Sequence, residues 1–157
     1  MKSYRHSFTV NAPLSAVAEF HKDTRALRQL TPPPLIVQFN NVEPLAEGSV
    51  ADFTMWAGPL PVRWVAVHSQ VTEQNGFVDT QKRGPFRSWQ HHHYFQAVDE
   101  QTTEVIDEIE GEYGNVISRF MWLNLPALFA YRAWRTRAVL DIENQTNKNR
   151  KDLEGTQ

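Results

Sequence analysis

The sequence predicts an α+β domain with two layers, a largely antiparallel sheet and one long helix near the C-terminal end. Two patterns support this prediction. Between residues 35 and 112, apolar side chains alternate with polar ones, and turn-forming residues divide the alternation into short segments, as in strands joined by hairpins. From residue 127 to residue 142, apolar side chains instead recur at helical spacing.

The segment before the sheet predicts one strand and two short helices. In residues 4–10, aromatic and apolar side chains alternate with polar ones, which indicates a strand. Residues 14–22 have helical spacing, and Asp23 or Thr24 can cap a second short helix. The prolines of residues 32–34 end that helix, because proline lacks the amide donor that a helix requires.

Six further strands are expected before the last helix. They are predicted over residues 35–42, 49–57, 62–72, 76–83, 89–98 and 102–112, with turns at Glu47-Gly48, Gly58-Pro59 and Gly84-Pro85. The last of them carries an acidic run, which we interpret as a solvated face of the sheet; it comprises Glu104, Asp107, Glu108, Glu110 and Glu112.

The long helix is predicted to begin near Pro126, because proline is accepted in the first turn of a helix. Its apolar stripe is expected to consist of Ala127, Tyr131, Trp134, Ala138 and Ile142. Residues 144–157 are polar and lack periodicity, so we expect a frayed tail there. One domain over residues 1–143 and a polar tail over residues 144–157 are therefore predicted.

Composition excludes several classes of function. The formal net charge is −2, which gives no electrostatic attraction toward nucleic acid or an anionic membrane. The chain has no cysteine, which rules out disulfides and thiolate nucleophiles. The most apolar stretch, residues 120–131, is too short and too interrupted to span a bilayer. Because the N-terminus has no signal-peptide core, we expect a cytoplasmic protein without stable membrane insertion.

Several motifs resemble a known superfamily. They are Phe20-His21-x-Asp23, Leu30-Thr31-Pro32-Pro33, Gly58-Pro59-x-Pro61-x-Arg63-Trp64, and the longer Phe77-x-Asp79-x-Gln81-x-x-Gly84-Pro85-Phe86-x-x-Trp89-x-His91-x-His93-x-Phe95. Together they resemble a bacterial ligand-binding branch of the START-like superfamily, also called SRPBCC or polyketide cyclase/dehydrase-like, over about residues 3–143. The sequence departs from this pattern at residues 112–115, where a proline and more glycines are expected.

The resemblance implies a helix-grip fold, in which a curved antiparallel sheet grips the long C-terminal helix over a hydrophobic cavity. It implies the binding of a small hydrophobic molecule, lipid-like, aromatic or polyketide-like, more directly than it implies a reaction. No cofactor is expected.

The hairpin over residues 76–98 is the most informative segment, because side chains two apart share a face of a strand. A turn with five unpaired residues would give the pairs Phe77–Phe95, Asp79–His93 and Gln81–His91. A four-residue turn would place Val78 opposite His93 instead. We favour the first register because it pairs aromatic rings with each other and a carboxylate with an imidazole.

One face of this hairpin therefore combines apolar bulk with a few polar groups, as a ligand-cavity wall does. Alternatively, the polar groups form a purely structural network, or the face points into water. With residues from the neighbouring strand and the long helix, the candidate ligand-binding set is Arg63, Phe77, Asp79, Gln81, Trp89, His91, His93, Phe95, Tyr131 and Trp134.

The same residues could also form two other kinds of site. His91, His93 and Asp79 could supply three metal ligands, but the sequence identifies no further ligand that converges on them, so no metal is expected. Asp79 could orient His93 as an acid–base catalyst, so the alternative function is a cyclase or dehydratase that acts on a polyketide-like or aromatic substrate. A third alternative is a partner-binding domain that forms a homodimer through exposed aromatic side chains.

Overall fold

The computed structural model describes residues 1–154, with side-chain detail for residues 1–141 and Thr146. Within this range it contains the elements β1 (Lys2–Val10), α1 (Leu14–Lys22), α2 (Ala26–Gln29), β2 (Ile36–Val42), β3 (Val50–Ala57), β4 (Leu60–Ser69), β5 (Gly76–Arg83), β6 (Phe86–Ala97), β7 (Thr103–Tyr113), α3 (Val116–Leu123) and α4 (Leu125–Glu154). The predicted α+β class and the order of its elements are confirmed.

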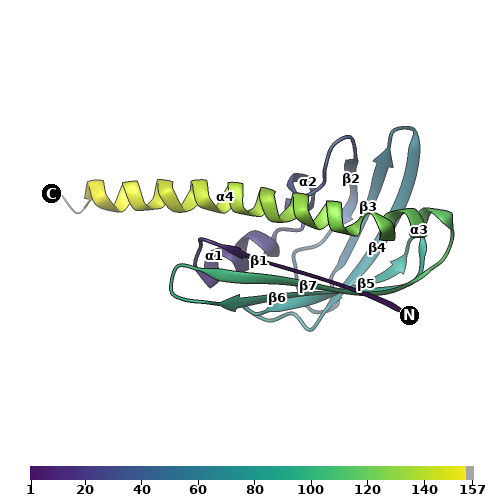
Figure 1. Ribbon diagram of the computed structural model, residues 1–157, viewed down its shortest axis with the longest axis horizontal. Coiled ribbons are helices and arrows are strands. Elements are labelled where there is room, and N and C mark those ends of the chain that lie inside the picture. Colours follow the sequence, from purple (N-terminus) through teal and green to yellow (C-terminus); the bar gives the residue numbers. More distant parts are fainter. Residues whose placement is uncertain (155–157) are drawn as a thin grey trace.

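The seven described strands form one antiparallel sheet in the order β1-β7-β6-β5-β4-β3-β2. Strands β1 and β2 occupy opposite edges, so α1 and α2 carry the chain across the molecule between them. Helix α4 runs across the sheet and packs on β1, while α1 packs on β6 and α2 on β2 (Figure 1). This is the helix-grip arrangement that the resemblance implied.

Buried apolar side chains gather into three groups, and the position of α4 among them leaves a space. The first group includes Val10, Val17, Phe95, Val105 and Leu140; the second includes Phe53, Trp64 and Phe86; and the third consists of Ile109, Leu125 and Phe129. Helix α4 contributes to the first and third groups but not to the second, which lies on β2, β3, β4 and β6. The helix therefore leaves part of the sheet's inner face uncovered.

A short helix that the sequence analysis did not predict, α3, precedes the long one. Its start is fixed by a capping box in which the Asn115 side chain accepts a hydrogen bond from the Ser118 amide at 3.0 Å. The Ser118 hydroxyl in turn accepts from the Asn115 amide at 2.9 Å. Because Asn124 alone separates α3 from α4, the chain reaches the long helix without the expected proline and glycines.

The buried stripe of α4 differs from the predicted one. It consists of Leu125, Phe129, Ala133, Thr136 and Leu140, whereas Trp134 of the predicted stripe is 58% exposed. Two apolar stripes run side by side along this helix, and helical spacing alone does not show which one is buried. The stripe that contains Phe129 and two leucines can bury more apolar area than one with two alanines.

The prediction of a frayed tail is wrong for residues 144–154, because α4 continues through Glu154. Figure 1 shows this last part of the helix projecting beyond the sheet. The lack of apolar periodicity was a poor guide here, because a helix end that projects from the sheet does not need an apolar stripe. Residues 155–157 of the predicted tail lie outside the described residues, and a domain that ends at residue 143 stays a prediction.

The β5–β6 hairpin has the predicted face but not the predicted partners. Phe77 pairs with His93 and Asp79 with His91, a shift of two residues from the expected register. An even shift keeps the same side chains on the same face, so the grouping of the predicted face survives. Gly76 begins β5 with φ +130°, and a side chain there would collide with the His93 carbonyl, so glycine is required at this end of the hairpin.

Candidate functional site

A cavity of about 960 Å³ lies between the inner face of the sheet and helix α4. Its walls come from β3, β4, β5 and β6, from the segment between His21 and Leu35, and from α3 and the first turns of α4. The volume is near the upper end of the range of roughly 300–1,000 Å³ that is typical of small-molecule sites.

Most of the wall is apolar, because alternate residues of β3 and β4 face inward. Ala51, Phe53 and Met55 line the cavity from β3. Trp64 lines it from β4, and its ring centroid lies 5.4 Å from that of Trp89 on β6 in an edge-to-face arrangement. Such packed aromatic rings provide a stiff apolar surface for a ligand.

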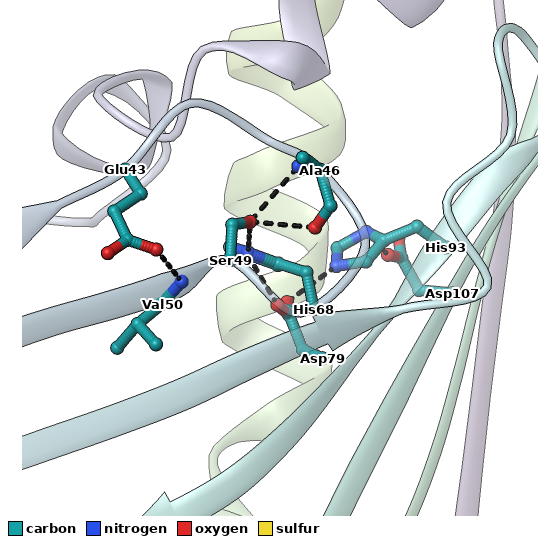
Figure 2. A network of polar contacts seen from close by, with 8 residues as sticks. All are labelled: Glu43, Ala46, Ser49, Val50, His68, Asp79, His93 and Asp107. Carbon is teal, nitrogen blue, oxygen red and sulfur yellow. Dashed lines mark hydrogen bonds and ion pairs between the residues drawn. The ribbon is translucent and has the colours of Figure 1, made fainter.

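A polar cluster interrupts this apolar wall, and Asp79 connects its first part. The Asp79 carboxylate oxygen Oδ1 lies 3.1 Å from Nε2 of His68, which is its cross-strand partner on β4. The second oxygen, Oδ2, lies 3.1 Å from Nε2 of His93. On the far side, Nδ1 of His68 lies 2.9 Å from the Ser49 hydroxyl (Figure 2).

Asp107 on β7 extends the cluster to a third histidine. Its Oδ1 oxygen lies 2.9 Å from Nε2 of His91 and 3.2 Å from Nδ1 of His93. The His93 ring is thus held between two carboxylates, Asp79 on one side and Asp107 on the other (Figure 2). We call Ser49, His68, Asp79, His91, His93 and Asp107 the histidine–aspartate cluster.

The contacts fix the charges in the middle of this cluster. Burial lowers the pKa of His93, but its contacts with Asp107 and Asp79 outweigh burial and raise this pKa from 6.5 to about 9. Burial raises the pKa of both carboxyls, but hydrogen bonds from the histidines bring each pKa well below its ordinary value. At neutral pH, His93 is therefore an imidazolium between two carboxylates.

Two further histidines beside the cavity, His91 and His21, are neutral at neutral pH. Burial and the neighbouring His93 charge lower the pKa of His91 to about 4, against the opposing effect of Asp107. Burial also lowers the pKa of His21 to about 4. The Val17 carbonyl accepts a hydrogen bond from Nδ1 of His21 at 2.8 Å, so the proton of this neutral ring is on Nδ1.

A cation from α4 faces the same cavity. Arg132 lies seven residues after Leu125 and three after Phe129, on the side of the helix that lines the cavity. Its guanidinium carbon lies 5.1 Å from the Phe129 ring centroid. Burial lowers the pKa of Arg132, while Asp107 and Asp79 raise it from a distance.

A metal ion could take three ligands from the cluster. Asp79, His91 and His93 each offer a ligand atom, and these atoms lie within 4.8 Å of one another. Both nitrogens of His93, however, lie within 3.2 Å of carboxylate oxygens and carry protons at neutral pH. Metal binding would have to displace a proton from this ring, so the described arrangement favours a hydrogen-bonded cluster over a metal centre.

Comparison with known proteins shows which fold this is. No protein-family model matches the sequence, and no curated protein matches it. Among solved structures, a START superfamily protein from Mycobacterium smegmatis superimposes with a TM-score of 0.70 at 10% identity, over 88% of this chain and 97% of that chain. The chain has the fold of the START superfamily.

Two enzymes share this START fold. An aromatase/cyclase from a Streptomyces species matches with a TM-score of 0.71 at 11% identity, over 89% of this chain and 93% of that chain. Norcoclaurine synthase from Thalictrum flavum, solved in complex with dopamine and hydroxybenzaldehyde, matches with a TM-score of 0.64 at 13% identity, over 88% and 85% of the two chains. At these identities the likeness shows the fold alone, and it confirms the START-like fold that the resemblance implied.

The START fold brings six of the ten predicted site residues to the cavity. These are Phe77, Asp79, Trp89, His91, His93 and Tyr131. Because they line the cavity, the alternative of an outward, water-facing hairpin face is wrong. Their predicted role in ligand binding stays a prediction.

The other four predicted site residues are placed elsewhere. Arg63 is on the outer face of β4, where it pairs with Asp52 at 2.6 Å. Gln81 donates to the Phe86 carbonyl at 2.9 Å and so closes the hairpin turn. Phe95 is buried in the first core group, and Trp134 is exposed. None of these four lines the cavity as the structure describes it.

Asp107, His68 and Arg132 are among the polar residues of the site that were not predicted from the sequence. Asp107 was assigned to the solvated acidic face, but it is only 5% exposed. Its position gave a usable signal, because it is odd-numbered like buried Val105 and Ile109, whereas the four glutamates are even-numbered. His68 has a similar signal from its alternation with Trp64, and Arg132 falls at helical spacing from Phe129.

In the described part of the chain, no helix is both long and apolar enough to cross a bilayer.

Proposed function

We propose that this protein binds a small hydrophobic molecule in the cavity between the sheet and α4. The observation that carries the proposal is the cavity itself, about 960 Å³ in volume and walled mainly by aliphatic and aromatic side chains. An apolar space of this size is costly to leave hydrated, and burying ligand surface contributes about 25 cal/mol per Å² of apolar area. The START fold supports the same function, since its members enclose ligands in this way.

The histidine–aspartate cluster would orient the ligand rather than supply most of the affinity. It sits in an otherwise apolar wall, and its ion pairs are already satisfied within the protein. A few fixed polar groups in an apolar pocket select among ligands of similar size. Phe77, which stacks on His93 with a centroid distance of 4.3 Å, links the cluster to the apolar surface.

The alternative is a cyclase or dehydratase with His93 and Asp79 as an acid–base pair. A general base needs a free lone pair within reach of the substrate. Nε2 of His93 is hydrogen-bonded to Asp79 at 3.1 Å, whereas Nδ1 lies 3.2 Å from Asp107 without a hydrogen bond. Because the pKa of His93 is raised to about 9, both nitrogens carry protons at neutral pH, and neither offers the lone pair of a base. The geometry therefore favours binding over this form of catalysis.

Native mass spectrometry of the freshly purified protein tests the proposal. We expect a co-purified molecule, and we expect delipidated protein to regain thermal stability when a lipid extract is added. Ala66→Leu, which reduces the cavity from β4, should weaken this stabilisation. Val67→Leu on the opposite face of the same strand is the matched control and should leave it unchanged.

Two results would count against binding. One is the absence of any stabilisation by lipid extracts or by hydrophobic compounds. The other is equal stabilisation of the Ala66→Leu variant and the wild type, which would place the ligand outside the cavity. The cytoplasmic location stays a prediction, which cell fractionation can test. The homodimer alternative also stays a prediction, which gel filtration can test.

A further inference from the structure

The cavity contains a cation whose hydrogen-bonding groups are not used. Nε of Arg132 is buried and has no hydrogen-bond partner among the described residues. Within the same part of the chain, no carboxylate lies within ion-pair distance of its guanidinium. The guanidinium carbon lies over the Phe129 ring, 5.1 Å from its centroid.

The nearby carboxylates, Asp79 and Asp107, do not accept hydrogen bonds from Arg132, because they contact histidines instead. Both oxygens of Asp79 face imidazole nitrogens, and Oδ1 of Asp107 faces two. These acids attract Arg132 from a distance but do not reach it. A buried N–H donor without a partner, such as Nε of Arg132, destabilises a protein unless an acceptor arrives from outside.

The position of Arg132 places these donors inside the ligand space. Leu125, Leu128, Phe129 and Arg132 all line the cavity from one side of α4. Arg132 is therefore the polar end of an otherwise apolar row that a ligand would lie along. The neighbouring arginine, Arg135, is used differently, since its Nε donates to the Gln29 carbonyl at 3.3 Å.

We propose that Arg132 binds the carboxylate of the cavity ligand, so that the ligand is a hydrophobic carboxylic acid. The inference rests on the proposed function and narrows it to one class of molecule. A planar guanidinium presents paired N–H donors that match the two oxygens of a carboxylate. An alcohol or a ketone has a single oxygen and cannot accept from both donors in the same way. The apolar body of the acid would lie against the aromatic wall around Trp64 and Trp89.

The test compares acids with alcohols of the same shape. Dodecanoate is paired with dodecan-1-ol, and 2-naphthoate with naphthalen-2-ylmethanol, so that both a chain and an aromatic body are tried. Affinities at neutral pH are measured by displacement of a neutral fluorescent probe, N-phenylnaphthylamine. For at least one pair we expect the acid to bind about 10- to 100-fold more tightly than the alcohol, the range of a buried charge-assisted pair.

Two variants locate the preference. Arg132→Met should reduce the acid-to-alcohol ratio to within about threefold while the alcohol binds as before. Arg135→Met removes the same charge one turn further along α4 and should leave the ratio unchanged. Circular dichroism checks each fold, and if Arg132→Met does not fold, Arg132→Gln replaces it with the same expected loss.

The outcomes separate this inference from the proposed function. If wild-type protein binds the alcohols as tightly as the acids, the carboxylate proposal is wrong and hydrophobic binding stands. If Arg135→Met loses the preference as fully as Arg132→Met, the effect is one of general charge and the assignment to Arg132 is wrong. If neither the acids nor the alcohols displace the probe, the failure lies with the proposed function itself.

Discussion

The imidazolium of His93 makes the stability of the protein depend on pH in a direction opposite to that of most buried histidines. Its pKa is raised to about 9 in the folded chain, against an ordinary value of 6.5. In this interval the folded state holds a proton that the unfolded state has released. The contribution of His93 to the free energy of unfolding therefore has its full value below pH 6.5 and declines as the pH rises toward 9.

The size of the decline follows from the proton count. One proton changes the free energy of unfolding by about 1.36 kcal/mol per pH unit, so the interval from 6.5 to about 9 corresponds to about 3 kcal/mol. The side chain is only 11% exposed, so screening by solvent reduces this little. Such a change is a large part of the roughly 5–15 kcal/mol that stabilises a typical domain.

The decisive comparison is between wild type and His93→Gln. We expect the variant to lose about 3–5 kcal/mol at neutral pH, because two buried carboxylates lose their shared cation. We also expect its stability to lack the wild-type decline between pH 6.5 and 9. His92→Gln is the matched control, since this neighbour is on the opposite face of β6 and contacts the Tyr94 hydroxyl instead.

Urea unfolding followed by tryptophan fluorescence, at intervals from about pH 6 to about pH 9.5, measures these free energies. A parallel loss of stability in wild type and His93→Gln over this range would contradict the raised pKa of His93. So would a His92→Gln variant that removes the decline as fully as His93→Gln does.

Four further predictions concern other parts of the fold. Below pH 6.5, stability should fall toward pH 4 as His21 and His91 resist protonation in the folded state, and the same urea series should show it; a flat acid limb would contradict their low pKa values. Phe129→Ala should cost about 3–5 kcal/mol in urea unfolding, since this side chain is 1% exposed; a loss under about 1 kcal/mol would contradict its central position. Arg63→Ala should leave urea stability and probe binding essentially unchanged, because its ion pair is solvent-exposed on the outer face; weakened binding would return Arg63 to the site. A chain that ends at residue 143 should melt within about 2 °C of the full chain, and a larger drop in the thermal scan would show that the end of α4 belongs to the domain.

The elements of this fold other than α3 could be predicted from the sequence, because each carries its own local signal. Period-two alternation marked the strands, and proline and glycine marked the turns, so most predicted bounds lie within three residues of the observed ones. Helix α3 was not predicted, because residues 116–123 have no charged pattern that separates them from the apolar start of α4. Its capping box at Asn115 and Ser118 was the one local signal available.

The site was harder to predict because it depends on which strands are neighbours. Asp79 and His93 are adjacent in one hairpin, so the sequence suggested their pairing. His68 and Asp107 join them only because β4 and β7 flank that hairpin in the sheet. The two-residue shift in register also placed Asp79 opposite His91 instead of His93. Separately, the pairing of β6 with β7 placed Asp107 opposite His93, with its Oδ1 oxygen 3.2 Å from Nδ1. Alternation indicates that His68 and Asp107 face the interior, but it does not show which residues of other strands they contact.

The partner of β1 also has a consequence for the order of folding. Strand β1 pairs with β7 alone, with Lys2 opposite Gly111, so more than a hundred residues separate the two strands along the chain. Closing so large a loop is slow, because its entropic cost precedes the contacts that reward it. During synthesis on the ribosome, β1 must therefore wait for the other six described strands, with Phe8 and Val10 uncovered in the meantime. Nascent chains of this protein should depend on a chaperone that shields the N-terminal segment until β7 has been made.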